Sequence, residues 1–359
     1  MDLLLAGPDY ADYFANKWTA LLKNRRDVES DKPANFAFHA WVRDSLLANK
    51  PYDQFVRELL AATGSVTGNP PVAWYGRVTE PKQQVEDVAQ LFLGVRMQCA
   101  QCHHHPFERW SQDDYYSLTA FFTRIGRKPG VQSGAARGEV MIFHQRGMAV
   151  ATNVKTGASL KPAALGDAMP PIAADEDPRL RLADWMGSKN NPFFAKALVN
   201  RYWKHFFGRG LIEPEDDIRD TNPPTNPALL AALEQHFVSS GFDLKELVRV
   251  ITRSQAYQLS ETPNEYNITD TQNYSRYYPR RLPAEVLHHS AAPMVEAARR
   301  LWGPAAGLGL AVVATVARRS GADAGFVSYH LFGPPPATDN DLLQLARALD
   351  DIERQVTHS

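Results

Sequence analysis

The chain has 359 residues, of which 44% are hydrophobic and 22% charged, and its formal net charge is −1. This composition is ordinary for a soluble globular protein, and the length gives room for two or three domains. The near-zero charge gives no electrostatic basis for binding nucleic acid or an anionic membrane surface. Two cysteines exclude a disulfide framework, and the longest apolar run, 305–317, is too short to span a bilayer.

The spacing of apolar residues predicts a mostly α-helical chain. In the first part of the chain, helices are expected over residues 10–22, 33–46, 55–64, 81–95 and 111–122. Asp31 and Thr79 are expected to cap the second and the fourth of these helices, and Gly64 to end the third. Ser111 and Asp114 have the spacing of a capping box at the start of the fifth. We interpret residues 1–128 as one helical domain.

The pattern changes after residue 128. Glycines, prolines and β-formers such as Val140–Phe143 predict a small β-rich or irregular insert over residues 129–172. A second helical domain is then expected over residues 173–300. Its helices are expected to begin after Asp177, Asn191, Asn226 and Asp243 and at Arg280, the last running to Trp302. The predicted fold is therefore mostly α, a multi-helical two-domain architecture with a small β-rich insert between the domains.

The strongest chemical signal is the sequence CAQCHHH, residues 99–105, which contains both cysteines of the chain. The order Cys-x-x-Cys-His is the attachment signature of c-type haem. Two thiols add to the vinyl groups of one porphyrin, and the adjacent imidazole ligates the iron. Cys99, Cys102 and His103 are therefore the candidate cofactor-binding residues for haem c. The motif is expected as a turn between two hydrophobic helices, where its burial would set the redox potential.

The same stretch supports a second interpretation, a structural zinc or another transition metal held without haem. The two thiols and the three imidazoles would then be the metal ligands, from Cys99, Cys102, His103, His104 and His105. Zinc usually takes four ligands, and a distant residue such as His144 would be needed if only part of this group reached the metal. A reversible redox pair of the two thiols, or an inert structural turn, is the third interpretation.

A haem would also need surroundings that the sequence indicates less clearly. Phe107 and Trp110 are candidates to wall the porphyrin, although buried aromatic residues more often only pack. The sixth iron ligand is left unassigned among Met141, His144, Met148 and Met169.

Two polar groups in the second helical region are weaker candidates. The acidic residues Glu213, Glu215, Asp216 and Asp217 could bind a hard cation, but a solvated turn paired with Arg209 or Arg219 is favoured. Asn200, Arg201 and His205 share a helix face that could line a polar pocket, although ties between helices are the favoured interpretation.

Motifs of the common enzyme classes are missing from the sequence. It contains no Ser-His-Asp order, phosphate-binding loop, dinucleotide fingerprint or His-Glu-x-x-His run. This argues against the common hydrolases and nucleotide-binding enzymes, and it leaves open whether the protein is an enzyme.

Two regions resemble a known pair of bacterial families. Residues 91–122, LFLGVRMQCAQCHHHPFERWSQDDYYSLTAFF, resemble the signature of the domain of unknown function 1549. Residues 191–230 and 240–260 resemble its usual partner, the domain of unknown function 1553. The likeness is to the C-terminal part of the first family and the N-terminal part of the second. It implies a planctomycete-type exported, mostly helical protein of unproven activity, in a family often linked to cytochrome c domains.

The resemblance and the motif together set the functional expectation. We expect a periplasmic or cell-surface protein whose leading function is redox or electron transfer through a c-type haem. One alternative is a non-enzymatic binding or scaffold protein with a structural metal, and another is a metal-dependent enzyme acting on surface polymers. An unidentified redox or surface partner is expected, and no nucleic acid.

The two ends of the sequence depart from the family pattern. The start, MDLLLAGPDY, is not a signal peptide, and the chain is expected to begin inside the first domain. The likeness is expected to fade past about residue 288. Residues 301–359 are interpreted as a divergent tail, and our hypothesis for residues 289–336 is a shifted or mis-predicted reading frame.

Overall fold

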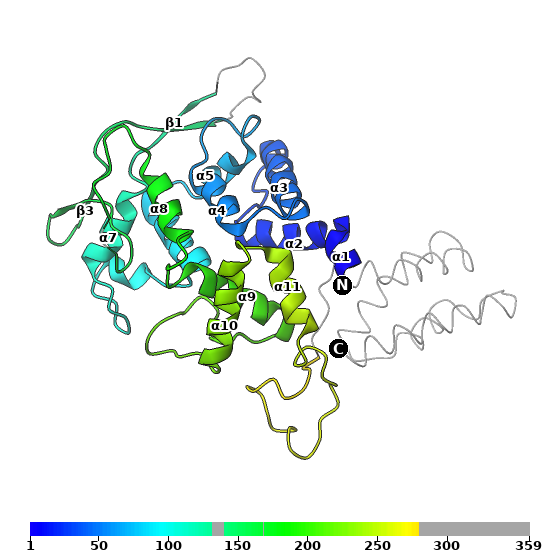
Figure 1. Cartoon of the computed structure of the whole chain (residues 1–359). Coiled ribbons are helices and arrows are strands. Elements are labelled where there is room, and N and C mark those ends of the chain that lie inside the picture. The colour runs from blue at the N-terminus through cyan, green and yellow to red at the C-terminus, as the bar shows by residue number, and fades with distance from the viewer. Residues whose placement is uncertain (131–139, 168, 280–359) are drawn as a thin grey trace, which may run out of the picture. The chain divides into compact units, whose positions relative to one another are not determined.

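The computed structural model describes residues 1–130, 140–167 and 169–279. All the helices and strands described lie in one compact unit, Met1–Tyr277. They are mostly helices, with two small antiparallel sheets of two strands each (Figure 1). The expectation of a mostly α fold with a small β insert is confirmed. The domain boundaries stay predictions, and the helix expected from Arg280 lies outside the described residues, as does the tail 301–359.

The elements that precede and contain the cysteine motif are α1 (Asp2–Ala6), α2 (Pro8–Leu21), η1 (Glu29–Asp31), α3 (Lys32–Leu47), α4 (Tyr52–Leu60), η2 (Pro70–Val72), α5 (Ala73–Arg77), α6 (Pro81–Val88), η3 (Ala89–Leu93) and η4 (Gln98–Gln101). The elements that follow the motif are α7 (Gln112–Ala120), β1 (Ile125–Pro129), β2 (Val140–His144), β3 (Ala151–Thr152), β4 (Ser159–Leu160), α8 (Pro178–Met186), α9 (Phe194–Phe207), α10 (Pro227–Ser239) and α11 (Leu244–Arg253).

Side-chain caps mark the starts of four helices, α7, α8, α10 and α11, whereas Asp31 stands at the cap position of α3 without a capping hydrogen bond. At α7, the Ser111 side chain accepts from the backbone N–H of Asp114, and the Asp114 side chain accepts from the N–H of Ser111. The side chains of Asp177, Asn226 and Asp243 likewise accept backbone N–H groups at the starts of α8, α10 and α11. These side chains satisfy donors that have no partner inside the helix, which is why the predicted starts are confirmed.

Two predicted boundaries are wrong, each for a local reason. The fourth predicted helix, α6, begins at Pro81, so the cap position falls on Glu80 and not on Thr79. Helix α4 ends at Leu60 rather than at Gly64. Gly64 instead exchanges two backbone hydrogen bonds with Ile142 of β2, at 2.7 and 2.9 Å. This bridge takes Gly64 out of helical conformation and ties the β-region to the end of α4.

Aromatic side chains join the N-terminal helices to α9. The ring of Tyr52 in α4 stacks on that of Phe194 at 4.8 Å between centroids, and Phe14 in α2 stacks on Tyr202 at 5.5 Å. The indole N–H of Trp18 also donates to the Tyr202 hydroxyl at 3.3 Å. All five side chains belong to one buried hydrophobic core that extends from α1 to Tyr274. The two helical regions therefore fold around a shared core.

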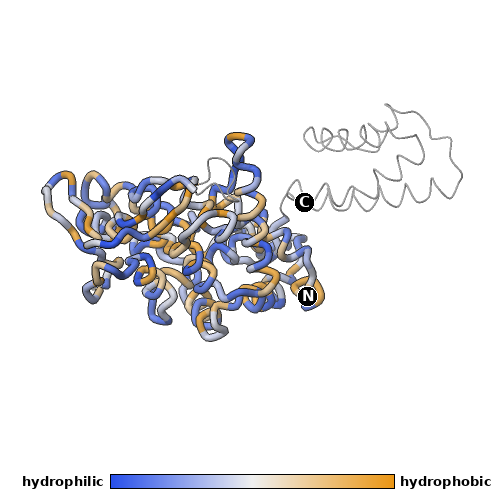
Figure 2. The backbone as a smooth tube through the Cα atoms, turned by 90° about the horizontal axis from the view of Figure 1, so that it is seen from above, coloured by the Kyte–Doolittle hydropathy of each residue, from blue (hydrophilic) through white to orange (hydrophobic). Residues whose placement is uncertain are grey.

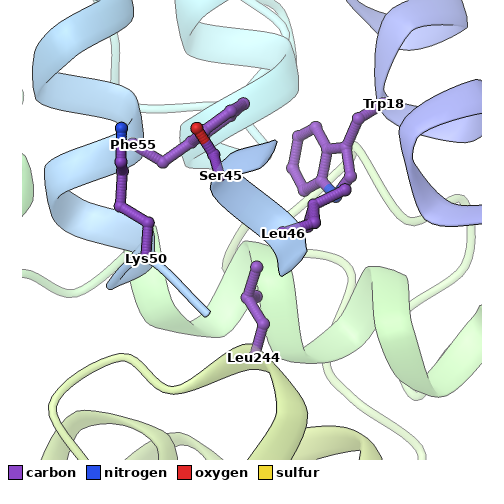
Figure 3. A pocket seen from close by; sticks show the side chains of 6 residues that line it. All are labelled: Trp18, Ser45, Leu46, Lys50, Phe55 and Leu244. Carbon is purple, nitrogen blue, oxygen red and sulfur yellow. The ribbon is translucent and has the colours of Figure 1, made fainter. Parts of the chain in front are cut away.

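No helix within the described residues is both long enough and apolar enough to cross a membrane. Hydrophobic and hydrophilic residues alternate along the tube of Figure 2, as is typical of helices that bury one face. A small depression between the helices has no room for a water molecule, so it is a line of contact between packed helices and not a binding cavity (Figure 3). Its lining residues are Trp18, Ser45, Leu46, Lys50, Phe55 and Leu244.

A buried arginine fastens α8 to α4. The side chain of Arg179 is 1% exposed and donates from Nη2 to Asp177 Oδ2 at 2.7 Å. Its Nη1 donates to the carbonyl oxygen of Ala62 at 3.1 Å, and its guanidinium lies 5.2 Å from the ring centroid of Tyr75. A buried charge of this kind is tolerated because each polar group of the pair has a partner.

We expect Arg179→Leu to lower the free energy of unfolding by about 3–5 kcal/mol, because it leaves the Asp177 carboxylate without its buried cation. The matched control is Arg181→Leu on the same helix, which removes a surface ion pair with Glu176 and should cost far less stability than Arg179→Leu. Urea denaturation followed by circular dichroism measures both. Equal losses in the two variants would contradict the role of Arg179.

Candidate functional site

The CAQCHHH motif lies directly after the end of a long helical segment. Helix α6 continues into the π-helical turn η3, which ends at Gly94 in the left-handed conformation with φ 67°. The chain then forms the 3₁₀ turn η4, in which the N–H of Cys102 donates to the carbonyl of Cys99 at 3.4 Å. The motif is therefore a tight turn between η3 and α7, the position that the sequence predicts.

The two cysteines are exposed, and the prediction that the motif turn is buried is wrong. Both thiols are free, and neither is joined in a disulfide. Met97 and Ala100, in contrast, are 0% exposed. A 3₁₀ turn has three residues per turn, so residues three apart share a face. Because Met97 and Ala100 take the inner face, Cys99 and Cys102 are presented together on the outer one.

His103 and His105 use their ring nitrogens differently. The Nδ1 atom of His103 lies 2.7 Å from the carbonyl oxygen of His104, so Nδ1 carries a proton and Nε2 keeps a free lone pair in the neutral ring. The Nδ1 atom of His105 instead accepts from the N–H of Phe107 at 3.3 Å. His103 is therefore the imidazole prepared to bind a metal through Nε2, whereas His105 has its lone pair engaged.

His105 and its neighbours form the half-buried base of the motif. The N–H of His105 donates to the carbonyl of Trp110 at 3.0 Å. Burial lowers the pKa of His105, and the positive charge of Arg219 lowers it further. Burial also raises the pKa of Glu108, a residue that the sequence analysis did not single out. The loop after the cysteines is thus a folded support for them.

The two aromatic residues proposed to wall a porphyrin lie in different environments. Phe107 is 64% exposed, with the guanidinium of Arg219 5.3 Å from its ring centroid. Trp110 is 4% exposed and packs edge-on against Phe193 at 6.0 Å. Only Phe107 is accessible to a group bound at the exposed thiols.

The acidic loop 213–217 packs against the segment that leads into the motif. Asp216 accepts hydrogen bonds from Arg96, at 2.5 Å, and from Gln90. Burial works to raise the pKa of Asp216, but the hydrogen bonds from Arg96 and Gln90 outweigh it and lower the pKa overall. Asp217 pairs with Arg219 at 3.1 Å, as predicted. The partner Arg96 could not be predicted from the sequence, because it lies 120 residues away from Asp216 along the chain.

The other two acidic residues are bound by α9. Lys204 donates to both Glu213 and Glu215, and Arg201 lies 3.6 Å from Glu215. Burial would lower the pKa of Lys204, but its hydrogen bonds to the two glutamates raise it overall. The acidic residues are therefore paired with Lys204 and Arg201 of α9 as well as with Arg219, the partner that the sequence analysis named.

A glycine lets this loop approach the motif closely. The N–H of Ile218 donates to the carbonyl of Gly94 at 2.8 Å. A Cβ at residue 94 would lie 2.6 Å from the Cδ1 of Ile218, closer than side chains can approach. The hydroxyl of Thr221 also donates to the carbonyl of Phe107 at 3.3 Å. The loop 213–221 thus contacts the chain on both sides of the cysteine turn.

The three polar residues of α9 are not brought together. Asn200 is buried and exchanges hydrogen bonds with the backbone of Ile212, at 2.8 and 2.9 Å. His205 packs against the ring of Phe14 at 5.3 Å. Arg201 alone of the three lines a polar pocket. The favoured interpretation was that Arg201 and His205 tie helices together. His205 does contact Phe14 of α2, whereas Arg201 pairs with Glu215 of the acidic loop.

Within residues 1–130, 140–167 and 169–279, no three or more His, Cys, Asp or Glu side chains gather in a way that could hold a metal ion. The ligand roles of Cys99, Cys102, His103, His104 and His105 stay predictions.

We expect NMR titration of the His105 ring protons to give a pKa below 6.5, the ordinary value for histidine. Because its pKa is lowered in the folded state, His105 stabilises the fold above pH 6.5 and this stabilisation is lost as the pH falls towards the folded pKa. Arg219→Gln should raise the His105 pKa and Asp217→Asn should lower it further, since their charges act in opposite directions. Shifts of the same sign in both variants would contradict this assignment.

Comparison with known families places the motif in the first of two matched regions. Residues 1–127 match the family described as protein of unknown function (DUF1549), and residues 178–307 match protein of unknown function (DUF1553). The DUF1549 match is thus the N-terminal one, and the DUF1553 match extends past residue 288, where the likeness was expected to fade.

An uncharacterized membrane protein of Mycobacterium tuberculosis is 84% identical over 49 residues, which are 14% of this chain and 13% of that protein. The chain therefore spans a small part of that relative. No solved structure matches the chain. The chain carries a DUF1549 match followed by a DUF1553 match, and the loop that supports the cysteine turn comes from the second.

Proposed function

We propose that this protein is an extracytoplasmic redox or electron-transfer protein with a c-type haem attached at the CAQCHHH turn. The observation that carries the proposal is the joint exposure of Cys99 and Cys102 on the outer face of η4, with His103 exposed directly after them. A porphyrin needs access to both thiols and to the imidazole, and all three side chains are open to solvent.

The residues present fit such a group. Attachment requires two thiols and one imidazole, and the turn supplies each of them. His103 is held by its Nδ1 contact with the carbonyl of His104, the usual arrangement for a histidine that ligates a metal through Nε2. When bound, the haem would supply one-electron redox chemistry.

The surrounding residues would position the turn and shield one side of the group. Phe107 offers an exposed ring beside the motif. The ion pair between Arg96 and Asp216 holds the segment that leads into the motif. Arg219 places a positive charge over the ring of Phe107. Solvent exposure of the turn, rather than its burial, would then be a main influence on the redox potential.

A location outside the cytoplasm, in the periplasm or on the cell surface, is part of the same proposal. It is supported by the chemistry, because c-type haem is attached outside the cytoplasm. The resemblance to exported proteins supports it independently.

We expect a Soret band that survives acid-acetone extraction when the protein is expressed with the haem-maturation machinery. Cys99→Ala and Cys102→Ala should each abolish double covalent attachment, and His103→Met should shift the spectrum because the axial ligand changes. His104→Gln is the matched control, since its contribution is a backbone carbonyl, and its spectrum should be unchanged. The absence of any extraction-resistant band in the unmutated protein would refute the haem proposal.

A structural metal is the second candidate. It would use the two exposed thiols and Nε2 of His103, and since no three such ligands gather among the described residues, binding would require the turn to rearrange. Elemental analysis of protein without a Soret band tests for it. If either group is held, Cys99→Ser should lower the melting temperature of the loaded protein by several degrees, because binding stabilises only the folded state. The control is the same substitution in protein without the group, obtained with a chelator for a metal and by expression without the haem-maturation machinery for haem. An unchanged melting temperature in both preparations would indicate an inert turn.

A further inference from the structure

An open pocket lies where the two matched regions meet. It has a volume of about 290 Å³. Its walls come from the end of α2, from α5, from α6 and η3, from α9 and from the acidic loop. The lining residues are Leu21, Lys23, Trp74, Asp87, Gln90, Leu91, Arg201, Glu215 and Asp216.

The charges that line this pocket are already paired. Lys23 Nζ lies 2.7 Å from Asp87 Oδ1, and Arg201 lies 3.6 Å from Glu215. Asp216 is bound by Arg96 and Gln90. An ion entering the pocket would therefore meet both signs of charge and would lose its hydration without gaining a counter-ion.

Hydrogen-bonding capacity remains after these pairs are made. The Nε of Arg201 is buried and, among the described residues, has no hydrogen-bond partner. Carboxylates have about four acceptor sites each, and Asp87 accepts from Lys23 in one contact. The pocket therefore offers several donors and acceptors at once, next to the apolar side chains of Leu21 and Leu91.

We propose that this pocket binds a neutral, polyhydroxylated ligand of the size of a single sugar ring. Hydroxyl groups both donate and accept, so they can match a lining that contains both paired cations and carboxylates. The volume lies just below the range for drug-sized ligands, which fits one ring and not a longer chain inside the pocket. Lys23 lies at the open rim, with its side chain 48% exposed. The inference does not depend on what the cysteine turn binds.

The test uses saturation-transfer NMR and calorimetry on the full chain with the methyl glycosides of glucose, galactose and mannose. Glucosamine and glucuronate serve as a cationic and an anionic comparator of the same size. At least one neutral glycoside should bind, and both charged sugars should bind more weakly. Binding of a charged sugar as tight as that of the best neutral one overturns the proposal, as does the absence of binding by all three glycosides.

Substitutions then locate the binding site. Asp87→Asn keeps the size of the side chain but removes a charged acceptor from the lining, and it should weaken binding by ~10-fold. The matched control is Asp184→Asn, which removes a surface partner of Arg57 outside the pocket. Gln90→Leu is a second pocket variant that changes no charge, in case Asp87→Asn perturbs the fold. If both pocket variants are folded and bind the glycoside with unchanged affinity, the assignment of the site is overturned.

Discussion

The packing of α9 against the N-terminal helices is the constraint on which the rest of the structure depends. Phe194 and Tyr202 project from this helix and stack on Tyr52 and Phe14. Stacked aromatic pairs contribute about 0.5–1.5 kcal/mol each beyond the surface they bury. With these contacts in place, the next segment of chain after α9 reaches the cysteine turn. The position of the acidic loop is thus a consequence of the aromatic core.

The cysteine turn combines a rigid inner face with an open outer one. Met97 and Ala100 anchor it in the core, and the three-residue period of η4 leaves the two thiols outside. The loop 213–221 holds the turn from its far side through Asp216 and Ile218. Two thiols are therefore exposed on a turn whose backbone is held on both sides, the arrangement that the proposed haem attachment would require.

Much of the local structure could be predicted from the sequence, because caps and periodicity depend on neighbouring residues. The capping box of Ser111 and the start of α10 after Asn226 are examples. The support of the site could not be predicted in this way. Arg96 contacts Asp216 only because tertiary packing brings the two segments together. The periodicity of apolar residues and the capping patterns do not predict such a contact. Burial of the motif was predicted wrongly, since flanking hydrophobic helices do not fix which face of a short turn points inward.

The bond between Trp18 and Tyr202 joins residues 184 positions apart, which has a consequence for how the chain is made. At the usual rate of protein synthesis, this separation corresponds to a delay of roughly 10–40 s. During that time the ribosome has released the N-terminal helices but not the helix that covers their aromatic faces. Contacts of such long range also slow folding in general. The aromatic faces of the nascent N-terminal helices therefore stay uncovered until α9 emerges.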